Sequence, residues 1–195
     1  MLRKEHTECQ IEVLRVFGNL TRWPAVREAL ADREVVSRLV TLLDSDNREL
    51  VYTTVGVLIN LMTDPGKRSD FNSFGGIDKL ILVLEDFGYS DWQLAALVCK
   101  VLWNLAADTD DVGQVFSDQQ ADQLAVVLDE YLDDEVLFPE SGLTAEEQQI
   151  AAMLRPLWEE FADVAASLLE KLDDSLESVA SAAAATVPSE SSKTA

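Results

Sequence analysis

Histidine is almost absent from this sequence of 195 residues, and its scarcity excludes several kinds of chemistry. The single histidine is His6, near the start of the sequence. Histidine-based triads and Cys/His zinc sites therefore cannot be assembled from this chain. The Gly75-Gly76 pair lacks the Lys-Ser/Thr of a phosphate-binding loop and the preceding strand of a dinucleotide site. We expect no enzymatic activity, no catalytic residues, no metal site and no cofactor.

Long apolar runs are also missing. No run approaches the roughly 18 residues that a membrane span requires. The charged opening MLRKEH lacks the uncharged apolar core of a secretion signal. Two cysteines without a cysteine-rich framework indicate a reducing compartment, so we expect a cytoplasmic protein. Cys9 and Cys99 lie in helical apolar patterns, and we expect both to be buried as small hydrophobic side chains.

Basic residues are scarce in the second part of the sequence. Residues 1–72 carry 10 basic and 11 acidic groups, whereas residues 73–195 carry 5 basic and 25 acidic groups. This distribution argues against nucleic acid or an anionic membrane as a partner, because both are polyanions. A protein partner with a basic patch would be attracted instead. The alternative is that the acidic surface is only a solvated face that keeps the chain soluble.

An apolar run that closes in Asn-Leu occurs three times, at offsets of 41 and 44 residues, and a second apolar run repeats at the same offsets. A period in this range is the signature of stacked two- or three-helix repeats. The apolar spacing within each run is helical rather than alternating. The larger second offset predicts an insertion in the loop 86–91, since loops absorb insertions at little cost. The runs are VFGNL, VLINL and VLWNL at 16–20, 57–61 and 101–105, and RLVTLLD, KLILVLE and QLAVVLD at 38–44, 79–85 and 123–129.

These repeats predict an all-α solenoid of about three repeats that starts in the middle of a repeat, because residues 9–20 match the third helix of a unit. The chain is then a C-terminal fragment or a short isoform of a longer array. We expect a long loop at 134–142, an interruption of the last helix at Pro156, and Glu159 at the position of the repeated asparagine. The expected helices are 23–32, 35–44 and 49–62, then 69–74, 77–85 and 91–107, then 110–118, 121–133 and 144–172.

The two ends of the array carry further expectations. A helical domain is expected to span residues 1–172, followed by a disordered Ala/Ser-rich tail at 173–195, which cannot bury enough apolar surface to stay ordered. At the other end, a third helix without an upstream repeat should expose apolar surface and favour self-association or early melting. The side chains expected to be exposed there are Ile11, Leu14, Phe17 and Leu20.

The residues of the second unit resemble the armadillo repeat, whose second helix begins at a Gly-Gly-Ile turn and whose third helix ends in Leu-x-Asn-Leu. Here the turn is Gly75-Gly76-Ile77 and the third-helix ending is Leu102-Trp103-Asn104-Leu105. The resemblance covers about residues 9–135. It implies a right-handed superhelix whose third helices line a concave groove for a protein partner, with upstream armadillo repeats in the full-length chain. It further implies an interaction scaffold in axoneme assembly of motile cilia and sperm flagella.

The same resemblance implies that third-helix asparagines can bond the backbone of an extended peptide. The tryptophan that nuclear-import receptors carry four residues before the asparagine is missing here, which disfavours that function, and Trp103 is expected in the core. The alternative for the asparagines is a structural bond between repeats. The alternative for the whole segment is a structural cap of a longer solenoid without its own ligand groove. The candidate partner-binding residues are Arg15, Asn19, Arg22, Tyr52, Asn60, Lys100 and Asn104.

Overall fold

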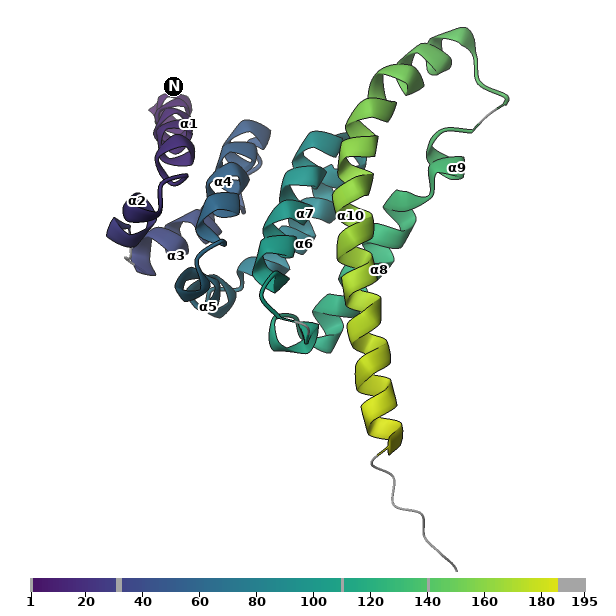
Figure 1. Ribbon diagram of the computed structural model, residues 1–195. Helices are drawn as coiled ribbons and strands as arrows, with labels where there is room; N and C mark the ends of the chain where they lie inside the picture. Colours follow the sequence, from purple (N-terminus) through teal and green to yellow (C-terminus); the bar gives the residue numbers. More distant parts are fainter. Residues whose placement is uncertain (1, 31–32, 110, 140, 186–195) are drawn as a thin grey trace, which may run out of the picture.

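The computed structural model describes residues 2–30, 33–109, 111–139 and 141–185 (Figure 1). All regular secondary structure within these ranges is helical, which confirms the all-α fold class. The α-helices are α1 (Leu2–Leu20), α2 (Pro24–Ala29), α3 (Arg33–Leu42), α4 (Arg48–Leu61), α5 (Pro65–Ser73), α6 (Gly76–Phe87), α7 (Trp92–Ala106), α8 (Asp118–Leu132), α9 (Asp134–Leu137) and α10 (Ala145–Ala185), with 3₁₀ turns η1 (Gly88–Ser90) and η2 (Val112–Gln114).

The third helices of successive repeats form one continuous layer. In Figure 1, α1, α4, α7 and α10 follow one another from left to right, and each packs against the next. The second helices α3 and α6 back this layer by packing on α4 and α7, and α8 packs on both α6 and α10. The short elements α2, α5 and η2 stand in the place of first helices. This arrangement confirms an armadillo-like solenoid of about three repeats.

The repeated leucines of the second helices occupy equivalent places in the core. Leu39, Leu80 and Leu124 are all buried, with at most 4% of their surface exposed. Full burial of one such side chain contributes about 1.5–3 kcal/mol. The two sequence offsets therefore mark structurally equivalent positions.

Side-chain caps fix where the third helices begin. Asn47 accepts a hydrogen bond from the backbone N–H of Leu50 at 2.9 Å, and Asp91 accepts one from Leu94 at 3.1 Å. Each cap satisfies a backbone donor that the first turn of a helix cannot pair internally. Asn47 and Asp91 are 44 residues apart, so the cap repeats with the period of the array.

The Gly75-Gly76 turn before α6 admits no larger residues. Gly75 adopts a left-handed conformation with φ of 72°. A Cβ on Gly76 would lie 2.4 Å from the ring of Phe71, which is fully buried. In this turn, which carries the armadillo resemblance, glycine is required at position 75 by the backbone conformation and at position 76 by close packing.

The third repeat departs from the predicted boundaries at its first helix. Instead of a helix at 110–118, the structure has only the 3₁₀ turn η2, because Asp111 caps Gly113 and the cap of α8 already starts at Ser117. Asp110 lies outside the described residues, as do residues 31–32 at the end of the predicted helix 23–32. The region of the predicted insertion, 86–91, holds the end of α6 and the turn η1.

The last helix is longer and more continuous than expected. Pro156 lies inside α10 without interrupting it, so that prediction is wrong. A proline in a helix costs about 3 kcal/mol, and the packing of α10 against α7 and α8 offsets this. Trp158 donates a hydrogen bond to the carbonyl of Tyr131 at 2.9 Å and anchors α10 to α8.

Helix α10 does not end at Leu172 but continues to Ala185. The end of the domain at residue 172 therefore stays a prediction. The part of the expected tail at 186–195 lies outside the described residues. The loop predicted at 134–142 contains the short helix α9, which Asp133 caps through the backbone N–H of Val136 at 3.2 Å.

Two expectations for the N-terminal helix are wrong. Cys9 is exposed, whereas Cys99 is buried as predicted, and burial raises the pKa of the Cys99 thiol to about 12. Ile11 and Leu14 are also buried, because they belong to the face of α1 that the packing against α4 covers. Leu20 is exposed as expected, and Phe17 is half-buried. Val13 and Val16 of α1 are also exposed.

Candidate partner-binding groove

Five of the seven candidate residues meet in one hollow on the third-helix layer. The hollow lies over α1 and α4 and reaches α7 at Leu97. Its floor includes Gly18 and Gly56, whose lack of side chains leaves room between the helices. The candidate residues that line it are Arg15, Asn19, Arg22, Tyr52 and Asn60.

Lys100 and Asn104 line a second hollow, between α7 and α10. Ile59 lines both hollows, so they adjoin along the third-helix layer. A third hollow at the start of α4 shares Arg15, Tyr52 and Thr53 with the first. We call these three connected hollows the concave groove.

The asparagines of α4 and α7 make the same bond between repeats. The amide Nδ2 of Asn60 donates to the carbonyl of Gly18 at 2.9 Å, and Nδ2 of Asn104 donates to the carbonyl of Ile59 at 2.9 Å. Gly18 and Ile59 each directly precede the asparagine of the preceding third helix. These geometries match the structural alternative stated for the asparagines. Asn19 instead donates to the carbonyl of Arg15 in its own helix, at 3.1 Å.

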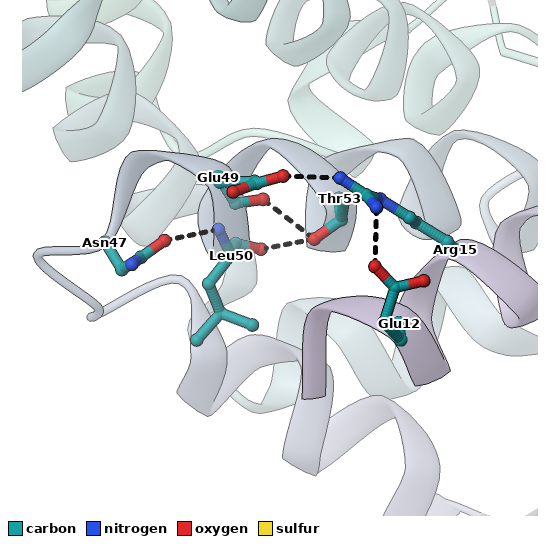
Figure 2. Close-up of polar contacts among 6 residues, drawn as sticks. All are labelled: Glu12, Arg15, Asn47, Glu49, Leu50 and Thr53. Atoms are coloured by element: carbon teal, nitrogen blue, oxygen red, sulfur yellow. Dashed lines mark hydrogen bonds and ion pairs between the residues drawn. The ribbon is translucent and has the colours of Figure 1, made fainter. Parts of the chain in front are cut away.

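An ion-pair network joins α1 to α4 at one edge of the groove (Figure 2). The guanidinium of Arg15 contacts Glu12 of its own helix at 2.6 Å and Glu49 of α4 at 2.5 Å. About half of the Arg15 side chain is exposed, so each pair contributes only about 0–1 kcal/mol. The network orients the guanidinium along the rim of the groove.

Tyr52 is held by a cation from its own helix. The guanidinium carbon of Arg48 lies 4.7 Å from the centre of the Tyr52 ring, and the same guanidinium pairs with Asp91 at the start of α7. Burial acts to raise the pKa of Asp91, but hydrogen bonds from Arg48 and from the backbone of Leu94 outweigh it, so this pKa lies below its ordinary value. Asp91 thus links α4 and α7 as a carboxylate.

The sequence did not predict which residues of α10 face the groove. Glu159 was expected at the position of Asn104, but Glu159 is exposed elsewhere on α10, and the α10 residues that line the hollow with Asn104 lie further along the helix. The repeat period was the signal that could have identified these residues, but the irregular connection after α8 and Pro156 interrupt that period. Trp103 is half-buried rather than fully in the core, with the Lys171 ammonium 5.4 Å from its ring centre. The lining residues missed on α10 are Asp163, Val164 and Ser167.

The groove offers amide, cationic and aromatic groups, which suit recognition of a polypeptide. Within the described ranges, no group of three or more His, Cys, Asp or Glu side chains could hold a metal ion. In the same part of the chain, no helix is long and apolar enough to cross a membrane.

Comparison with known proteins gives one consistent result. No family model matches the chain, and no solved structure matches it. Armadillo repeat-containing protein 2 of Mus musculus is 37% identical over 173 residues, covering 88% of this chain and 20% of the relative. The proteins of the same name from Bos taurus and Homo sapiens are each 36% identical, over 83% and 65% of this chain and 18% and 14% of their own lengths.

The chain therefore spans a fifth or less of the length of these curated relatives. The matched region includes most of the repeats described above, whose period, Gly-Gly turn and stacked third helices agree with the names of the relatives. The chain belongs to the armadillo repeat family and is similar to armadillo repeat-containing protein 2.

Proposed function

We propose that this chain is a non-enzymatic interaction scaffold that holds an extended segment of a protein partner in the concave groove. The observation that carries the proposal is the convergence of Arg15, Asn19, Arg22, Tyr52 and Asn60 in one hollow, continuous with the hollow of Lys100 and Asn104. Such a surface can pair with backbone amides and with acidic or polar side chains of a bound segment.

The charge of the groove differs from that of the chain as a whole. Its charged lining residues are four basic and two acidic, whereas residues 73–195 carry 25 acidic and only 5 basic groups. The basic residues are Arg15, Arg22, Arg48 and Lys100, and the acidic ones are Glu49 and Asp163. A partner segment with an acidic group near Arg22 and a basic patch outside the groove would complement both surfaces. The outer basic patch would speed association at low salt, because steering between opposite charges is screened as ionic strength rises. Neither nucleic acid nor an anionic membrane combines an acidic group with a basic patch in this way.

The cellular setting is proposed from the cysteine content and from the resemblance. The two cysteines without a cysteine-rich framework favour the cytoplasm. The resemblance noted from the sequence favours association with the cilium or flagellum, in axoneme assembly and spermatogenesis. The relatives are much longer than this chain, so further armadillo repeats are proposed as its neighbours.

A second candidate function is a structural cap of a longer solenoid. It is favoured by the asparagine bonds, because the Nδ2 groups of Asn60 and Asn104 are bonded to the neighbouring helix. In that case the groove residues would stabilise the array and would not contact a partner.

Affinity capture with the full chain separates these two functions. Ciliated or testis cell extract is the source, and a partner identified by mass spectrometry is then purified for direct affinity measurement. Arg22→Ala should weaken its binding about tenfold, since a hydrogen bond to a charged group contributes about 1.5–3 kcal/mol. Arg38→Ala is the matched control, because Arg38 is exposed on α3 outside the groove. Equal affinities of both variants and the parent would favour the cap.

A further inference from the structure

The first turns of α10 extend beyond the start of α7 (Figure 1). Helix α7 begins at Trp92, whose ring centre lies 5.2 Å from that of Phe161 in α10. Trp103 and Lys171 meet further along, so the two helices run in the same direction. Because α10 begins at Ala145, it runs roughly 24 Å past the start of α7 at a rise of about 1.5 Å per residue. We call residues 145–157 the α10 arm.

An apolar stripe of α10 continues from the core onto the arm. Spacings of three and four residues place Leu157, Leu154 and Ile150 on the same face as Phe161. Phe161 is fully buried, Leu157 and Leu154 are half-buried, and Ile150 is 47% exposed. Met153, three residues after Ile150, is 66% exposed. The stripe therefore loses its cover toward the start of the helix.

The turn before α7 presents an aromatic side chain beside this stripe. Tyr89 in η1 has its ring centre 5.6 Å from that of Tyr131 and 5.9 Å from that of Trp92. Both of those rings also contact Phe161, which belongs to the stripe. The Tyr89 side chain is half-exposed. A helix laid along the arm would therefore rest on Tyr89 at the end nearer the core.

The α10 arm is held as a helix by contacts within the chain. The hydroxyl of Thr144 accepts a hydrogen bond from the backbone N–H of Glu147 at 3.3 Å, and the Glu147 carboxylate accepts one from the backbone N–H of Thr144 at 2.7 Å. This reciprocal capping box pairs backbone donors at the start of the helix. Arg155 joins the arm to the end of α9, with its guanidinium carbon 4.6 Å from the ring centre of Phe138. The surface is therefore formed in advance, which lowers the entropic cost of binding.

Acidic groups surround the exposed part of the stripe. Glu146 and Glu147 precede Ile150 by four and three residues, so they lie one turn away on the same side of the helix. Residues 129–160 include ten acidic residues and one basic residue, Arg155, which already contacts Asp134 at 3.8 Å. A second copy placed arm to arm would bring like charges together, which opposes such a dimer. A basic segment would be attracted instead.

We propose that the α10 arm binds an amphipathic helix of a protein partner, with basic residues beside its apolar face. Apolar side chains at helical spacing cover Ile150, Met153 and Leu154, as in other complexes where a helix docks through one face. The basic residues lie opposite Glu146 and Glu147. The lining residues of the concave groove lie outside the arm, so this is a second interaction surface. The inference does not depend on occupation of the concave groove.

Two synthetic peptides and the full chain provide the test. The amphipathic peptide is about 16 residues long, spans about 24 Å as a helix, and carries leucine at helical spacing on one face and lysine elsewhere. The scrambled peptide has the same composition but no apolar face. Fluorescence anisotropy measures the affinity of the chain for each peptide.

The variants separate apolar contact from charge. Ile150→Gln combined with Met153→Gln removes two apolar side chains without changing the net charge. Val126→Gln is the matched control, because Val126 is an exposed apolar residue of α8 outside the arm. Circular dichroism confirms that each variant keeps the parent fold.

The parent and Val126→Gln should bind the amphipathic peptide equally. The double glutamine variant of Ile150 and Met153 should bind it at least about tenfold more weakly, because a few apolar anchors carry most of the binding energy of such interfaces. The scrambled peptide should also bind the parent at least about tenfold more weakly. Glu146→Gln combined with Glu147→Gln keeps a capping box and should weaken binding about two- to tenfold, the range for two exposed ion pairs.

Equal affinity of the parent and the Ile150→Gln/Met153→Gln variant for the amphipathic peptide would overturn the proposal, since charge alone would then explain the binding. Equal affinity of the parent for the two peptides would overturn it for the same reason. Sedimentation velocity tests the other occupant. If the parent dimerises and this double variant does not, a second copy covers the arm, and the proposal is wrong.

Arg22→Ala distinguishes this surface from the concave groove. The variant should leave the affinity for the amphipathic peptide unchanged, because Arg22 lines the concave groove and lies outside the arm. A loss of affinity in this variant would place the peptide in the concave groove and would overturn the proposal. A failure of the proposed function would leave all of these readouts unchanged, since none of them involves the partner of the concave groove.

Discussion

The side-chain amide of Asn104 donates a hydrogen bond of 2.9 Å to the backbone carbonyl of Ile59, one residue before the equivalent asparagine of the preceding repeat. Asn60 does the same to Gly18. Gly18 and Ile59 lie in the last turns of α1 and α4, where backbone carbonyls lack a partner within the helix, and the asparagine amide supplies the missing donor. The repeated asparagine therefore makes a hydrogen bond that sets the register between third helices. Its replacement is expected to lower the stability of the array.

Replacing Asn60 and Asn104 together with alanine removes three hydrogen bonds, because Asn60 also donates to the hydroxyl of Thr21 at 3.1 Å. The free energy of unfolding should fall by about 1.5–4.5 kcal/mol, since each lost bond contributes about 0.5–1.5 kcal/mol. Urea unfolding followed by circular dichroism measures this. The control is Asn19→Ala, whose bond lies within its own helix at an exposed position and should cost less. Stability equal to that of the parent would show that these bonds between repeats contribute nothing.

Gly76→Ala should destabilise the chain by about 1–3 kcal/mol, because the new methyl group would overlap the buried ring of Phe71. Gly56→Ala is the contrasting variant: nothing lies within 4 Å of its Cβ, and it occupies the middle of α4. Alanine there should stabilise by about 0.5–1 kcal/mol. Thermal melts of the two variants should therefore move in opposite directions, and a shift of both in the same direction would contradict this packing.

The ion pair between Arg48 and Asp91 should make stability depend on pH. The pKa of Asp91 is lowered in the folded state, so its contribution is present above the unfolded pKa of about 3.9. The contribution is lost as the pH falls through the folded pKa. Asp91→Asn keeps a side chain that can cap α7 but removes the charge.

The stability difference between the parent and Asp91→Asn should therefore be largest at neutral pH and shrink as the pH falls below about 4, because the unfolded carboxylate protonates there and the folded carboxylate protonates only at still lower pH. Unfolding midpoints measured in parallel at several pH values provide the check, and the subtraction removes the effect of other acidic groups. A difference that stays constant down to the lowest pH would show that the charge of Asp91 is not involved.

The two cysteines should react differently with a thiol reagent. Cys9 is exposed and should be labelled in the native chain, whereas the buried Cys99, with its pKa raised to about 12, should react only after unfolding. Mass spectrometry of the labelled, digested protein identifies the site. Equal labelling of the two cysteines without denaturant would mean that α7 is not buried as described.

The repeat period predicted the second and third helices well, because apolar faces at helical spacing are set by the sequence itself. The Gly75-Gly76 turn was recognisable because two adjacent glycines are a turn signal. The role of Asn60 and Asn104 could not be decided, since an amide can bond a ligand or a neighbouring carbonyl, and the distance between helices determines which. The burial of Ile11 and the exposure of Cys9 depend on which face of α1 meets α4, which periodicity alone left open.

The facing residues of α10 were missed for a different reason. The connection after α8 and the presence of Pro156 break the period, so no offset could align α10 with α7. Its register is set by tertiary contacts, such as the Trp158 bond to Tyr131 and the packing of Phe161 on Trp92 with ring centres 5.2 Å apart. These contacts place Asp163 and Ser167 in the groove.

Site-specific photo-crosslinking tests the central claim, that a protein partner occupies the concave groove, most directly. A benzophenone amino acid replaces Tyr52, an aromatic residue of the groove, or Val126, which is 67% exposed on α8 in the second-helix layer. With the identified partner present, the account predicts a crosslink from position 52 and none from position 126, and loss of that crosslink in an Arg22→Ala background. Crosslinking from position 126 but not from position 52 would contradict it.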